Sequence, residues 1–86
     1  MKPDAPDVMA MMAEAEFDRG RTKEAAAYSR KAIELDPNVA NPYAFIGTLD
    51  QTEGRRKEAK ANYEKYLQLA PTGKYASDLK ALVKTL

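Results

Sequence analysis

An internal repeat with a period of 34 residues is the feature that most constrains the fold of this 86-residue chain. Pairs of identical or small residues follow this offset without a gap: Ala13 and Gly47, Gly20 and Gly54, Arg21 and Arg55, Glu24 and Glu58, Ala25 and Ala59, Leu35 and Leu69, and Pro37 and Pro71. A period of roughly 20 to 50 residues is typical of proteins that stack copies of one supersecondary unit over a shared core. The sequence therefore predicts two equivalent stacked units.

Each unit has the pattern of two helices joined at its glycine. Apolar and small residues recur at helical spacing on both sides of Gly20 and Gly54. The first unit contributes Met9, Met12, Ala13 and then Ala25, Tyr28, Ala32, Ile33 and Leu35; the second contributes Tyr43, Ile46, Gly47, Leu49 and then Ala59, Tyr63, Tyr66, Leu67 and Leu69. Glycine suits the turn because it adopts positive φ without a Cβ clash. Asp4 or Asp7 is the expected cap of the first helix, and Asn41 with Pro42 that of the third.

A further amphipathic segment follows Pro71. Its apolar residues recur at helical spacing: Tyr75, Leu79, Leu82, Val83 and Leu86. No partner helix follows, so we expect a terminal helix that covers the apolar edge of the second unit. The predicted organisation is a lead-in at residues 1–5, repeat units at 6–39 and 40–73, and a capping helix at 74–86, all in one all-α domain.

The composition limits the chemistry that this domain can perform. Fourteen basic and thirteen acidic residues leave a formal charge of +1, and the chain has no cysteine and no histidine. Thiol nucleophiles, zinc-thiolate sites and the commonest general base are therefore missing. Glu14 and Asp18 share a helix face, but such pairs are ordinary on solvated helices. We expect no catalysis, no cofactor and no metal site.

Nucleic acid and membranes are also unfavoured as partners. The basic run Arg55–Lys57 with Lys60 is interleaved with glutamates and lies at a predicted turn. The segment from Met1 to Val8 lacks the pattern of a signal peptide, and no stretch approaches the roughly 20 apolar residues of a membrane span. The absence of cysteine leaves the redox compartment undetermined.

The pattern resembles the tetratricopeptide repeat family over residues 6 to 71. The matching residues are Met12-Ala13, Ala25, Ala32 and Pro37 in the first unit, and Tyr43, Ile46-Gly47, Ala59, Tyr63 and Pro71 in the second. The departures are Met9, Glu16, Ser29, Asp50 and Tyr66, which stand where the family has other residue types. The resemblance implies a right-handed helical-repeat solenoid of two helix-turn-helix hairpins plus the capping helix, five helices in all.

By the same resemblance, the chain is expected to be a non-catalytic module that binds a peptide or protein segment in the concave groove formed by the first helix of each repeat. The predicted groove residues are Asp7, Ala10, Met11, Glu14, Phe17, Asp18, Asn41, Ala44, Phe45, Thr48, Gln51 and Thr52, with Tyr75, Asp78 and Leu82 added by the cap. Phe45 and Met11 are expected to contact apolar side chains of the ligand, and Glu14 with Asp18 its lysines or arginines. The expected partner is therefore a basic-amphipathic segment.

Self-association is the alternative function. The first helix of a short solenoid has no covering neighbour, so pairing of two copies through this open edge would hide Met9, Met12 and Phe17.

Overall fold

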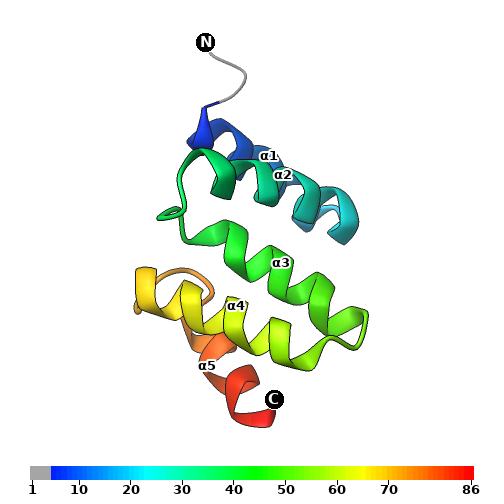
Figure 1. Cartoon of the computed structure of the whole chain (residues 1–86), viewed down its shortest axis with the longest axis vertical. Helices are drawn as coiled ribbons and strands as arrows, with labels where there is room; N and C mark the ends of the chain where they lie inside the picture. The colour runs from blue at the N-terminus through cyan, green and yellow to red at the C-terminus, as the bar shows by residue number, and fades with distance from the viewer. Residues whose placement is uncertain (1–4) are drawn as a thin grey trace.

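The computed structural model describes residues 5–86, and over this range it contains five helices and no strand. The helices are α1 (Pro6–Asp18), α2 (Thr22–Leu35), α3 (Asn41–Thr52), α4 (Arg56–Leu69) and α5 (Ala76–Thr85) (Figure 1). The predicted all-α fold of stacked helical hairpins is confirmed. Residues 1–4 of the lead-in predicted at 1–5, with Asp4 as a possible cap, lie outside the described residues.

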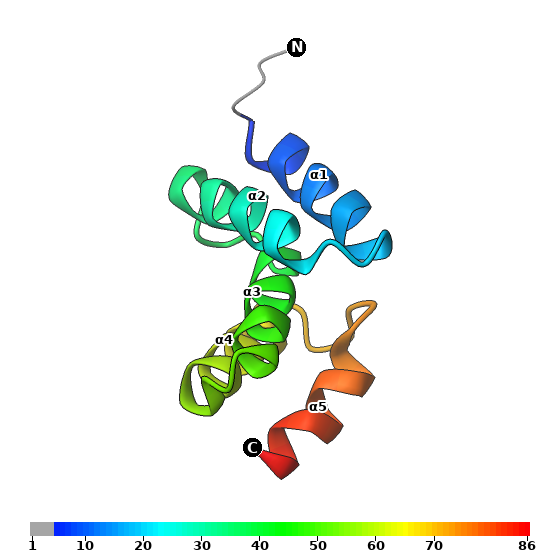
Figure 2. The same ribbon diagram turned by 90° about the vertical axis from the view of Figure 1, so that its right-hand side faces the viewer.

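The helices form a stack 40 Å long. Within the hairpins, α1 packs on α2 and α3 packs on α4. The two hairpins contact each other through α2 and α3, and α5 packs on α4. The first hairpin lies at one end of the long axis and α5 at the other (Figure 1). The connection between α4 and α5 runs on the side of the stack where α1 lies (Figure 2), and its Lys74 contacts Glu14 of α1.

The two hairpin turns have the same geometry. Gly20 and Gly54 have φ values of 78° and 79°. The Arg21 N–H donates to the Glu16 carbonyl at 2.9 Å, and the Arg55 N–H donates to the Asp50 carbonyl at 2.8 Å, again 34 residues apart. A left-handed residue that lets the following N–H bond back to the last turn of the helix is a common helix ending. The prediction that the glycines form the turns is confirmed.

Small residues lie where the helices cross. Ala13, Ala25 and Ala59 are completely buried. A Cβ on Gly47 would lie 2.5 Å from Cε1 of Tyr63, closer than atoms in real structures approach. Larger side chains at these positions would separate the two helices of a hairpin.

The predicted helix caps are wrong. The N-cap residues are Ala5 and Ala40, and neither helix has a side-chain cap. Asp7 and Asn41 are already helical, although the Asp7 carboxylate accepts a bond from the Val8 N–H at 3.0 Å. Both helices carry a proline in the first two positions, and because proline has no N–H there is one donor fewer to cap.

Two predicted packing residues lie at the surface. Met12 is 38% exposed and Leu35 is 48% exposed. Both belong to the first hairpin, which no preceding helix of the described chain covers. In the second hairpin, by contrast, the equivalents Ile46 and Leu69 are partly covered.

Candidate functional site

The middle of the predicted groove is filled by an aromatic cluster of three rings, Phe17 from α1, Phe45 from α3, and Tyr75 from the turn before α5. The centroid of the Phe17 ring is 4.6 Å from that of Phe45 and 6.2 Å from that of Tyr75, and the Phe45 and Tyr75 centroids are 5.6 Å apart. Phe45 is completely buried. It therefore cannot contact a ligand directly, and the expectation that it does so is wrong, because Phe17 and Tyr75 pack against its ring.

The Glu14 carboxylate, predicted to contact a ligand, is bonded to the chain itself. Its Oε2 accepts hydrogen bonds from Lys74 Nζ and from the Tyr75 hydroxyl, each at 3.0 Å. The bond from Lys74, followed by that from Tyr75, lowers the pKa of Glu14. Burial, together with donation to Glu14, raises the pKa of Tyr75 to about 12. These contacts join the connection before α5 to α1 on the side of the predicted groove.

The other predicted groove residues differ in exposure. Those at the surface are Asp7, Met11, Asp18, Gln51 and Thr52; those half-buried are Ala10, Phe17, Asn41 and Thr48; and Ala44 is buried. Several polar groups among them already have partners within the chain. Thr48 and Thr52 donate to carbonyls of their own helix, and Gln51 accepts from the Tyr63 hydroxyl at 2.8 Å. Among the proposed cap residues, Leu82 packs on the core and Asp78 is exposed.

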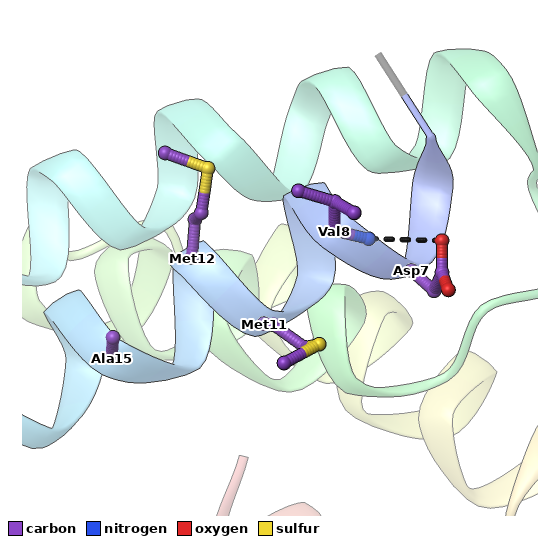
Figure 3. A pocket seen from close by; sticks show the side chains of 5 residues that line it. All are labelled: Asp7, Val8, Met11, Met12 and Ala15. Atoms are coloured by element: carbon purple, nitrogen blue, oxygen red, sulfur yellow. Dashed lines mark hydrogen bonds between the residues drawn. The ribbon is translucent and has the colours of Figure 1, made fainter. Parts of the chain in front are cut away.

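An open apolar hollow of about 470 Å³ lies along α1. It is lined by Asp7, Val8, Met11, Met12 and Ala15, all from this one helix (Figure 3). Met11 is 68% exposed. We call the four apolar residues Val8, Met11, Met12 and Ala15 the outer face of α1. They follow the spacing i, i+3, i+4, i+7, which places them in one stripe of a helix.

Only part of this surface could be predicted from the sequence. The pattern predicts Met11 in the groove and Met12 at a packing position of the repeat, which the self-association alternative leaves at the open edge, and it assigns no role to Val8 or Ala15. The sequence of α1 nevertheless contains a signal for this exposed apolar face. Met9, Ala13 and Phe17 already form one apolar stripe on α1, so the second stripe marks a helix that is apolar on two sides.

Charged residues at the glycine turns form ion pairs within the repeats. Arg21 pairs with Glu16 at 3.6 Å, and Arg55 pairs with Asp50 at 3.0 Å and with Glu53 at 2.7 Å. Asp50 is buried and also accepts from Asn62 at 2.8 Å. Part of the basic run at residues 55–57 thus stabilises the turn.

Residues 5–86 contain no group of three or more potential ligands arranged to hold a metal ion. None of the helices α1–α5 is long and apolar enough to cross a membrane.

Comparison with known sequences identifies the family. The sequence model of the tetratricopeptide repeat matches residues 6–39 and 40–72. The chain belongs to the tetratricopeptide repeat family. Repeats of this family are non-catalytic and generally mediate protein–protein interactions. The chain is also similar to the type IV pilus assembly protein PilF of Pseudomonas aeruginosa, at 39% identity over 51 residues. This match covers 59% of the chain and 20% of the relative, so the matched segment spans about a fifth of that protein's length.

Proposed function

We propose that this tetratricopeptide repeat chain is a non-catalytic interaction module that binds a protein partner along the outer face of α1. The observation that carries the proposal is the exposure of apolar side chains at one end of the stack. The large hydrophobic residues exposed in the described chain are Met11, Met12 and Leu35, all in the first hairpin. Leu35 lines a separate hollow with Met9, whereas Met11 and Met12 lie together on the outer face of α1. A grouped apolar surface such as this face is typical of an interaction site. Methionine suits it because its flexible thioether adapts to different partners.

The charge of α1 indicates what kind of partner would bind. The helix contains four acidic residues and no basic residue. Asp7 borders the hollow, and Asp18 is exposed one turn beyond Ala15. Neither forms an ion pair with any of residues 5–86. A partner segment with apolar residues on one side and lysine or arginine at its border would complement this surface, as when an amphipathic helix packs into an apolar groove.

The concave groove is the less favourable surface. A ligand there would have to displace the Tyr75 ring and break both hydrogen bonds to Glu14. The outer face of α1 requires no such rearrangement, because its apolar side chains are already in contact with solvent.

The proposed surface is small, so the expected affinity is modest. One helix face offers less area than a standard stable interface, and we expect a dissociation constant no better than roughly micromolar. The similarity to a pilus assembly protein supports a role in bringing protein components together.

Nuclear magnetic resonance titration with a synthetic peptide tests the proposal. The peptide is an amphipathic helix with leucines on one face and lysines at its border. We expect chemical-shift changes at Val8, Met11, Met12 and Ala15, and a loss of affinity of at least about tenfold in Met11→Glu, because a carboxylate would be placed in the apolar contact. The matched control is Gln68→Glu, which adds the same charge to an exposed position of α4. Binding undiminished by Met11→Glu, or shifts confined to α2 and α4, would refute the proposed surface.

A further inference from the structure

We infer that the partner of the outer face of α1 is a second copy of this chain, which docks through the exposed face of its α5. This inference rests on the proposed function and names the partner of the same surface. The α5 outer face consists of Ser77, Lys80, Ala81 and Lys84, all of which are exposed. The contact joins opposite ends of two molecules head to tail.

The two ends of the stack carry opposite charge. α1 has four acidic residues and no basic residue. α4 and α5 together have six basic and three acidic residues. Lys80 and Lys84 form no ion pair within residues 5–86. Because the overall charge of the chain is only +1, this separation of charge favours the approach of one end to the other rather than general attraction to polyanions.

The two faces also match in spacing and size. The α5 outer face follows the spacing i, i+3, i+4, i+7, the same as the outer face of α1. Each stripe is about 10 Å long at 1.5 Å per residue. The α1 face presents two large methionine side chains, whereas the α5 face presents the small residues Ser77 and Ala81 beside the long side chains of Lys80 and Lys84. Large side chains on one helix pack into the space left by small residues on the other.

The flanking charges complete the match. When the stripes are in contact, the lysines of the α5 outer face, Lys80 at its edge and Lys84 within it, are available to pair with Asp7 and Asp18, which lie beside the outer face of α1. The flexible stem of lysine lets its ammonium group reach a carboxylate along the edge of an apolar contact. The aspartate of α5, Asp78, lies next to Ala81, about 60° from it around the helix, at the edge of the α5 outer face opposite to Lys80.

The geometry predicts an open assembly. The two faces lie at opposite ends of the 40 Å axis (Figure 1), so a molecule that uses one face leaves the other free. Such a heterologous contact extends into a chain or closes into a ring. A symmetric contact between two α1 outer faces would instead bring acidic residues together, which is unfavourable. The contact area of one helix pair predicts weak association that high salt suppresses.

Sedimentation of the full chain over a concentration series at low and high salt is the first experiment. We expect the mean mass to rise with concentration at low salt and to fall toward that of the monomer at high salt. Two charge-reversed variants then test the faces separately. Asp7→Lys with Asp18→Lys alters the α1 end, and Lys80→Glu with Lys84→Glu alters the α5 end. Each variant alone should sediment as a monomer, and an equal mixture should again associate, because it contains one unaltered end of each kind.

The outcomes separate this inference from the proposed function. If the wild type stays monomeric while Met11→Glu still weakens binding of the peptide, the inference is overturned and the proposed function stands. Self-association that persists in the Lys80→Glu, Lys84→Glu variant would also overturn it, because that variant lacks the predicted basic face. If both peptide binding and self-association are unaffected by Met11→Glu, both ideas fail.

Discussion

Gly47 lies where α3 crosses α4, and the close approach of the two helices there allows a quantitative prediction. A Cβ at this position would lie 2.5 Å from Cε1 and 2.6 Å from Cδ1 of Tyr63. The ring of Tyr63 has little room to move, because the residue is 1% exposed and its hydroxyl donates to Gln51 at 2.8 Å. In Gly47→Ala the two helices must therefore move apart or the ring must leave its position.

The expected change is the balance of two effects. Overpacking a core costs about 1 to 3 kcal/mol, and the fixed ring places this site in the upper part of that range, at about 2 to 3 kcal/mol. Replacing glycine by alanine inside a helix returns about 1 kcal/mol through helix propensity. The net destabilisation of Gly47→Ala is about 1 to 2 kcal/mol, which lowers the Tm of a domain of this size by about 4 to 16 °C.

Thermal melting followed by circular dichroism measures this change. The control is Ala61→Gly at an exposed position of α4, which reports the propensity difference in this chain without altering the packing. We expect it to destabilise by up to about 1 kcal/mol. A Gly47→Ala variant that melts at or above the wild-type temperature would show that α3 and α4 are not in close contact at this position.

Four further predictions concern the C-terminal segment and its contact with Glu14 of α1. Tyr75→Phe removes the hydrogen bond to Glu14 and should lower the free energy of unfolding by about 0.5 to 1.5 kcal/mol. It should also raise the pKa of Glu14 toward its ordinary value, as measured by carboxyl chemical shifts, and an unchanged pKa would contradict the contact. Because the pKa of Glu14 is lowered in the folded protein, the carboxylate contributes to stability above pH 4.5, and this contribution is lost as the pH falls below that value. Glu14→Gln should therefore weaken the fall of the Tm at acid pH, and the same fall in both proteins would contradict this role of Glu14. The pKa of Tyr75 is raised from 10.0 to about 12, so its contribution is present below pH 10 and is lost through pH 12, an alkaline dependence that Tyr75→Phe should reduce. Deleting residues 72–86 removes the ring that packs against Tyr66 and should produce aggregation or non-cooperative melting, whereas a monomer that melts as before would show that α5 is not a structural cap.

The repeat could be predicted from the sequence because its signals are local. Gly20 and Gly54 mark turns through a backbone conformation that other residues rarely adopt, and the helices between them follow from spacing alone. The small residues at the crossings were predicted for the same reason, since Ala25 and Ala59 repeat with the period. The caps were not predicted correctly, because the first-turn prolines remove a donor that a cap would satisfy.

The candidate surface could be predicted only in part. Met9 and Met12 are three residues apart on one helix, yet Met9 is 7% exposed and Met12 is 38% exposed. The repeat pattern assigns both to packing positions, because in a longer stack a preceding hairpin would cover the edge of α1. Only the position of α1 at the end of the described stack decides which methionine is exposed.

The sequence by itself determined the two hairpins, their glycine turns and the amphipathic terminal helix, because these depend on backbone preferences and on contacts between residues close in the chain. Only the tertiary structure decided which surface is free. Phe45 is buried because Tyr75, thirty residues later, packs against it, and Glu14 is bonded to Lys74, sixty residues later. No local pattern encodes such contacts, since they depend on how the connection between α4 and α5 returns toward α1. For this reason the proposed binding surface is the outer face of α1 and not the groove predicted from the sequence.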